Sequence, residues 1–156
     1  MAAPRDVHGA CVVVGEAGVL IRGASGSGKS TLALAVVEAA MGRGLFARLV
    51  ADDRVLLGVV HGRLVARPHP ALAGLVEERG IGILPTSYLP AAVLRLVVDL
   101  EPAPRRLPER ADVLVEGIVL PACVLPSGRA RACSVLRRLG AVALSAGAPL
   151  VASPGT

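Results

Sequence analysis

Residues 23–30 read Gly-Ala-Ser-Gly-Ser-Gly-Lys-Ser and match the pattern G-x-x-x-x-G-K-[ST] at every fixed position. The apolar run Val19 to Ile21 before them predicts a strand. The segment Ser30 to Met41, which contains no Gly or Pro, predicts a helix that Gly42 and Gly44 end. This strand–loop–helix context is the one in which the pattern forms a phosphate-binding loop. It predicts an α/β fold and a site for a nucleoside triphosphate.

Each residue type of this loop has a chemical reason. Glycines let successive backbone N–H groups turn toward one anion, and the following helix points its N-terminal dipole at the same place. Lys29, the only lysine among seventeen basic residues, would neutralise the β- and γ-phosphates of ATP, and the Ser30 hydroxyl would ligate Mg²⁺. The residues expected to hold the nucleotide are Gly23, Ala24, Ser25, Gly26, Ser27, Gly28, Lys29, Ser30 and Thr31.

A pair of carboxylates, Asp52 and Asp53, follows the next predicted strand, Arg48 to Ala51. An acid of the Walker B type stands at the end of such a strand in P-loop enzymes. Two adjacent carboxylates can divide the work, since one can face the metal and the other the proton of the nucleophile. We therefore expect Asp52 to be a metal ligand.

The rest of the chain mixes strands and helices. The sequence predicts strands at Cys11–Val14, Val55–Val60, Arg63–Ala66, Val93–Leu100, Val113–Leu120 and Ala122–Leu125, helices at Ala71–Val76 and Arg129–Leu139, and loops at Glu77–Gly82 and Glu101–Arg110. The continuous apolar character of Val93–Leu100 indicates a central strand. Hairpins among the strands mean that the sheet is mixed, and the length predicts a single α/β domain over residues 1–156.

Composition excludes several function classes. The formal net charge is +5, but the arginines are scattered, and with one Tyr, one Phe and no Trp there is no platform for stacked bases, so we expect no nucleic-acid partner. The three cysteines lack the spacing of a disulfide framework or a zinc site. Neither a signal peptide nor an apolar run of about 18 residues is present, so we expect a cytoplasmic protein without a membrane partner.

Four segments together resemble the catalytic domain of the HPr kinase/phosphorylase family. They are His8-Gly9, the loop 23–30, Ala51-Asp52-Asp53-Arg54-Val55 and Val76-Glu77-Glu78-Arg79-Gly80-Ile81-Gly82-Ile83, and the resemblance covers residues 6–130. The family phosphorylates a serine of HPr, a carrier of the sugar phosphotransferase system, and removes the phosphate by phosphorolysis. The resemblance implies a P-loop kinase-like mixed β-sheet with flanking helices, similar to PEP carboxykinase. It also implies ATP and Mg²⁺, HPr or an HPr-like phosphocarrier as partner, and a homo-oligomer, a hexamer in the family.

The same resemblance assigns roles to residues outside the glycine-rich loop. His8 matches a histidine that the family places at the active site, and Asp53 matches the carboxylate that takes the serine proton. Glu77 matches an acid that helps hold Mg²⁺. Arg79 belongs to the signature loop, and Arg106 aligns with a catalytic arginine that would stabilise charge on the transferring phosphoryl group.

The chain also departs from the family pattern. The family's N-terminal domain is expected to be absent, and Pro126 stands where the family has a basic residue in a stretch tied to dephosphorylation. Kinase chemistry is therefore better supported than phosphorylase chemistry. Two other functions fit the loop: a different small P-loop kinase or NTPase, and a nucleotide-sensing module without catalysis.

Overall fold

The computed structural model describes residues 3–102 and 112–145, and the side chains of this part up to residue 142. The strands are β1 (Arg5–His8), β2 (Ala10–Val14), β3 (Ala17–Gly23), β4 (Ala47–Ala51), β5 (Arg54–Val60), β6 (Arg63–Pro68), β7 (Leu75–Glu78), β8 (Gly82–Pro85), β9 (Ala92–Leu100), β10 (Asp112–Val115) and β11 (Ile118–Leu125). The helices are α1 (Lys29–Gly42), the 3-10 turn η1 (Arg129–Arg131) and α2 (Ala132–Ser145).

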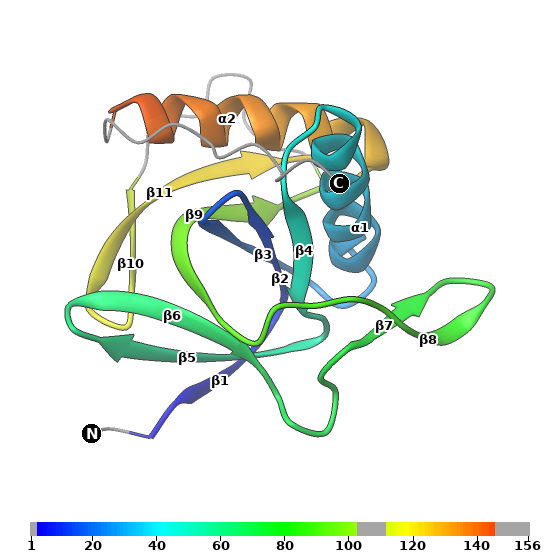
Figure 1. Ribbon diagram of the computed structural model, residues 1–156, viewed down its shortest axis with the longest axis horizontal. Coiled ribbons are helices and arrows are strands. Elements are labelled where there is room, and N and C mark those ends of the chain that lie inside the picture. The colour runs from blue at the N-terminus through cyan, green and yellow to red at the C-terminus, as the bar shows by residue number, and fades with distance from the viewer. Residues whose placement is uncertain (1–2, 103–111, 146–156) are drawn as a thin grey trace.

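One large curled sheet forms the body of the molecule, and β7 and β8 form a separate hairpin that projects from it (Figure 1). The main path through the sheet is β1-β5-β6-β9-β3-β2-β4, and β9 also pairs with β11. The β3–β9 and β9–β11 pairs are parallel, whereas the other ladders are antiparallel. The predicted mixed α/β fold and the central place of the β9 strand are therefore confirmed.

Two apolar cores stabilise this sheet, one on each face. Both helices pack on one face, where Leu32 of α1 and Leu139 of α2 meet Leu96 of β9 in one buried cluster. On the other face, residues of β5 and β6 such as Leu57 pack against β2, β3 and β9, among them Leu20. Within the described residues, neither helix is long and apolar enough to cross a lipid bilayer.

The predicted helix at Ala71–Val76 is wrong. The chain there makes two turns, in which Leu72 N–H bonds to the His69 carbonyl and Leu75 N–H to the Leu72 carbonyl, and then enters β7. Gly74 has a φ of 73°, which a right-handed helix does not contain. Packing of Val76 against the helical-face core outweighs the local helix preference of this segment.

Three other boundaries differ from the sequence prediction. The expected loop Glu77–Gly82 is the outer part of the β7–β8 hairpin. The expected strand Val113–Leu120 is broken by a turn at Glu116-Gly117, where both φ angles are positive, so it divides into β10 and β11. β1 was not predicted, because its charged residues carry no apolar alternation. Most of the expected loop Glu101–Arg110 lies outside the described residues.

Candidate active site

The glycine-rich loop, residues 23–28, lies between β3 and α1, as predicted. A Cβ on Gly23 would stand 2.5 Å from the Ser27 hydroxyl oxygen and 3.2 Å from the Leu100 Cβ, so a side chain there would require both neighbours to shift. Next to it, the Arg22 guanidinium donates two hydrogen bonds to the Asp99 carboxylate, at 2.8 and 2.9 Å. These bonds raise the pKa of Arg22. They also fix the start of the loop to the central strand β9.

The N-terminus of α1 is open toward an anion. Gly28 caps the helix with a φ of 92°, no side chain caps it, and its first turn contains no acid. The free N–H groups and the helix dipole therefore face the loop without a protein partner. The Lys29 ammonium group is buried and donates to the carbonyls of Gly23 and Ala24, both at 2.9 Å. An ammonium group has three N–H donors, so one remains for a ligand.

The Asp52 carboxylate connects three parts of the site. It is only 4% exposed and lies directly after β4. One oxygen accepts the Ser30 hydroxyl at 2.6 Å, and the other accepts the backbone N–H of Glu77 at 3.0 Å. Asp52 thus attaches the start of α1 and the β7–β8 hairpin to the end of β4.

The neighbouring Asp53 points outward and contacts His8. The distance from His8 Nδ1 to Asp53 Oδ1 is 3.3 Å, and both side chains are about half exposed. Asp53 has a φ of 68°, a left-handed conformation that is uncommon outside glycine and is concentrated at functional sites. Strand β1 places His8 here, because it pairs with β5 and because Asp6 forms an ion pair with Arg54 that lowers the pKa of Asp6.

Lys29, Ser30, His8 and Asp53 line one cavity of about 500 Å³. Its walls are the glycine-rich loop, the start of α1, the end of β1, Asp53 directly before β5, and the tip of the β7–β8 hairpin. The lining residues are His8, Ser25, Gly26, Gly28, Lys29, Ser30, Thr31, Asp53, Glu77, Glu78, Arg79, Gly80 and Gly82. The glycine-rich loop and the β7–β8 hairpin, which are more than 40 residues apart in the sequence, therefore face the same cavity.

Most residues singled out from the sequence come together here. Gly23, Ala24, Ser27 and Asp52 do not line the cavity and lie behind its wall, whereas Arg106 lies outside the described residues. Glu78 lines the cavity but was not among the predicted site residues, although it stands next to Glu77. The catalytic and metal-binding roles of all these residues remain predictions.

The oxygen groups of the site fit a Mg²⁺ ion that arrives with a phosphate. No three His, Cys, Asp or Glu side chains in the described part of the chain could hold a metal ion by themselves. Mg²⁺ is commonly bound by only one or two carboxylates together with substrate phosphates and water. The Ser30 hydroxyl and the Asp52 carboxylate, 2.6 Å apart, are such hard oxygen ligands. Glu77 is bonded to the same carboxylate through its backbone.

Comparisons with known proteins identify the family and the fold. The family model described as "HPr Serine kinase C-terminal domain" matches residues 1–101. The chain is 39% identical over 142 residues to an HPr kinase/phosphorylase of Limosilactobacillus reuteri, an alignment that covers 80% of this chain and 42% of the relative. It is 38% identical over 122 residues to an HPr kinase/phosphorylase of Neisseria meningitidis, which covers 73% of this chain and 36% of the relative.

A solved structure shares the fold. It is described as the structure of the Hpr(Ser) kinase/phosphatase from Coxiella burnetii and superposes with a TM-score of 0.73 at 23% sequence identity. The superposition covers 90% of this chain and 99% of that chain. By contrast, the chain spans less than half the length of the two curated relatives described above.

Proposed function

The chain belongs to the family of the HPr serine kinase C-terminal domain, and we propose that it is an ATP-dependent kinase that phosphorylates a serine of HPr or of an HPr-like phosphocarrier. The observation that carries this proposal is the position of Asp53, with His8 beside it, on the same cavity as the glycine-rich loop. A module that only senses a nucleotide needs no exposed carboxylate opposite its phosphate site. We infer HPr as the acceptor from the curated relatives, which are named HPr kinase/phosphorylase.

The phosphates of ATP would lie in the glycine-rich loop. The uncapped first turn of α1 offers backbone N–H groups. The carbonyls of Gly23 and Ala24 accept two N–H groups of the Lys29 ammonium group and so orient the third N–H toward the phosphates. These groups neutralise the β- and γ-phosphates without moving the backbone. The loop therefore acts as a phosphate-binding loop, as its sequence predicts.

Ser30, Asp52 and Glu77 would hold Mg²⁺ at the edge of this loop. When bound, the ion would offset the negative charge that develops on the phosphoryl group during transfer. Asp52 would keep the Ser30 hydroxyl oriented. The hairpin would bring Glu77 close because its backbone is bonded to the same buried carboxylate.

Asp53 would act as the base. The serine oxygen of the acceptor forms a bond to the γ-phosphorus, the bond from phosphorus to the β–γ bridging oxygen breaks, and the serine proton passes to the Asp53 carboxylate. His8, at 3.3 Å, would hold that carboxylate toward the acceptor. Arg79, at the tip of the hairpin, would offset charge on the equatorial phosphoryl oxygens. Arg106 would contribute in the same way, by the family resemblance.

Phosphorolysis would be a second activity of the same site. Inorganic phosphate would take the place of the leaving nucleotide, attack the phosphoserine and form pyrophosphate, and Asp53 would return the proton to the serine oxygen. Pro126 replaces a basic residue of the family in a stretch tied to this direction, so we expect the kinase direction to be the stronger one. Residues 1–156 would act as one catalytic domain, in the cytoplasm and as a homo-oligomer.

Transfer of label from γ-labelled ATP to HPr tests the proposal. The chain should label HPr of the same organism in the presence of Mg²⁺ and should not label an HPr variant with alanine at the acceptor serine. The Lys29→Ala variant should give no label. Adding inorganic phosphate afterwards should release label as pyrophosphate if phosphorolysis occurs. Hydrolysis of ATP without labelled HPr would indicate an NTPase, and tight ATP binding without turnover would indicate a sensor; either result contradicts the proposal.

A further inference from the structure

A second cavity, of about 580 Å³, lies at the other end of the central strand. Val93 and Arg95, near the start of β9, line it, whereas Leu100 at the end of β9 pairs with Gly23 of the glycine-rich loop. The two cavities share no lining residue. Cavities that bind small molecules have volumes of roughly 300–1,000 Å³. The second cavity is therefore large enough for a ligand of its own.

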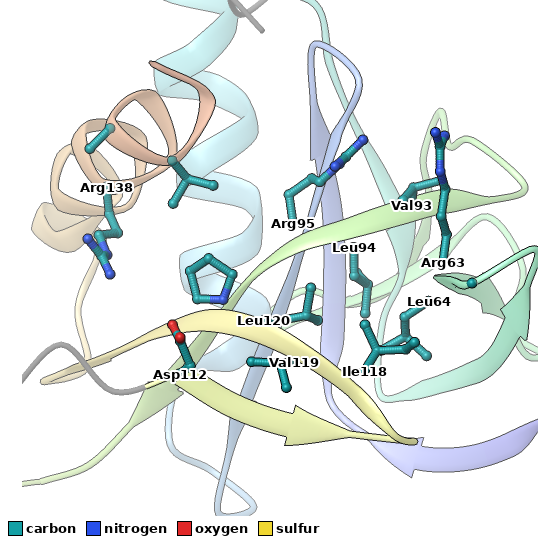
Figure 2. Close-up of a pocket in the computed structure, with 14 residues that line it drawn as sticks. Arg63, Leu64, Val93, Leu94, Arg95, Asp112, Ile118, Val119, Leu120 and Arg138 are labelled. Atoms are coloured by element: carbon teal, nitrogen blue, oxygen red, sulfur yellow. The ribbon is translucent and has the colours of Figure 1, made fainter. Parts of the chain in front are cut away.

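Three arginines from three different elements line this second cavity: Arg63 of β6, Arg95 of β9 and Arg138 of α2 (Figure 2). Within the described part of the chain, none of their three guanidinium groups forms an ion pair or a hydrogen bond with a protein group. Asp112 is the only acid of the lining, and it forms no ion pair with any of them. The lining therefore carries an excess of positive charge that the described residues do not balance.

An irregularity in β9 places one of these arginines. On β3, Gly18 pairs with Leu94, but the next residue pairs with Leu96, so one residue of β9 is left without a partner. That residue is Arg95, which is exposed although β9 is the central strand. A β-bulge of this kind redirects a side chain and is often found next to functional sites.

The other strand adds a like charge on the same face. β6 and β9 are antiparallel, with Val65 opposite Val93. Arg63 and Arg95 each lie two residues beyond this pair, past the last paired residues of the two strands, and Figure 2 shows both side chains extending in the same direction. Like charges held on the same side of a cavity repel each other. A bound anion would relieve this repulsion, and arginine is well suited to phosphate and carboxylate groups.

The remainder of the lining is mostly apolar. Leu120 of β11 and Val142 of α2 are among the residues that form it. We propose that this cavity binds an organic anion, with its phosphate or carboxylate group held by Arg63 and Arg95 and its apolar body against Leu120 and Val142. The site is separate from the nucleotide cavity, so this proposal does not depend on the proposed kinase activity.

Calorimetric titration of the full chain with three probes of equal chain length tests the proposal. The probes are hexyl phosphate, hexanoate and the neutral hexanol. At least one of the two anions should bind about tenfold more tightly than hexanol, since a hydrogen bond to a charged group contributes roughly that factor. The anion that binds more tightly identifies the head group. Equal binding of the three probes, or no binding of any, would overturn the proposal.

Three variants locate the binding. The double variant Arg63→Gln/Arg95→Gln changes exposed side chains and should weaken anion binding about tenfold or more while hexanol binding stays the same. Arg67→Gln is the matched control, because Arg67 is exposed on the same strand but does not line the cavity. Lys29→Ala is the second control and tests whether the anion binds at the glycine-rich loop instead. Anion binding should be unchanged in this variant. Loss of anion binding in either control, or full binding in the double variant, would overturn the proposed site.

Discussion

The two halves of the candidate active site are held in different ways. The inner half consists of the buried Lys29 and Asp52 and the half-buried Ser30, and all three side chains are hydrogen-bonded to other parts of the chain. The outer half lies at the surface with few protein contacts, and it consists of His8, Asp53, Glu77 and Arg79. The contrast is sharpest between two adjacent residues, since Asp52 is 4% exposed and the Asp53 side chain is 59% exposed. A preformed inner half suits a phosphate, whereas an open outer half leaves room for a protein acceptor.

The largest expected effect on phosphoryl transfer comes from removing the negative charge of Asp53 in the outer half. Asp53→Asn should lower phosphoryl transfer by about 10²- to 10⁴-fold, because the variant lacks the carboxylate proposed as the general base. Asparagine accepts the left-handed conformation of this position, so the fold should not change. Nucleotide affinity should stay within a few-fold of the wild type. Parallel measurements of transfer rate and ATP affinity check both expectations.

Lys29→Ala is the matching change in the inner half. It should weaken ATP binding and transfer together, because the proposed role of the ammonium group is to hold the phosphates both in the bound state and during transfer. If Asp53→Asn instead lost ATP affinity and kept its transfer rate at saturating ATP, the proposed division between the two halves would be wrong.

The sequence predicts the inner half much better than the outer half, for a physical reason. The glycine-rich loop and α1 are contiguous, so spacing alone places Lys29 and Ser30, and Asp52 follows an apolar strand. The outer half is assembled by long-range pairing. His8 reaches the site only because β1 pairs with β5, and Glu77 only because the hairpin is bonded to Asp52. No local pattern marks either contact, and only the family resemblance indicated these residues.

The difference between local sequence patterns and long-range contacts also explains where the sequence prediction of the fold is wrong. The sequence of the long apolar strand β9 predicts a buried strand whichever neighbouring strands it pairs with. The sequence predicts a helix and a loop where the β7–β8 hairpin lies, since these residues carry no alternation of apolar and polar side chains. Packing of Val76 and Leu84 against the core holds it as a hairpin, and that contact is not visible in the sequence.

The next largest effect concerns the buried carboxylate. Asp52→Ala should lower the free energy of unfolding by about 2 kcal/mol, because the Ser30 hydroxyl and the Glu77 N–H both lose a charged acceptor. Denaturation by urea measures this change. Asp53→Ala serves as the comparison, since it removes no buried hydrogen bond. An equal loss of stability in both variants would contradict the view that only the inner half is structurally held.

The core next to the inner half should respond to alkaline pH. Cys11 of β2 is fully buried beside the end of β4, and burial raises the pKa of its thiol from 9.0 to about 12. Between these values the unfolded chain loses the thiol proton and the folded chain keeps it. The free energy of unfolding should therefore fall as the pH rises above 9, by about 1 kcal/mol on reaching pH ~10.

Variants at two cysteines separate this effect from other titrations. Cys11→Ala should reduce the alkaline loss of stability, measured by urea denaturation at pH ~8 and pH ~10. Cys133→Ala should keep the whole loss, since Cys133 is exposed. If the two variants lost stability equally over this interval, burial of the Cys11 thiol would not be its source.

The smallest expected effect concerns the free-energy cost of the left-handed backbone conformation of Asp53. Asp53→Gly should raise the free energy of unfolding slightly, by less than about 1 kcal/mol. Glycine adopts a φ of 68° without steric cost, but it also adds entropy to the unfolded chain, and the two effects partly cancel. The exposed contact with His8 contributes little to offset the gain. The same variant should lose phosphoryl transfer as Asp53→Asn does. A more stable and inactive chain would show that strain at this position is retained for catalysis, whereas a destabilised one would show that Asp53 also supports the fold.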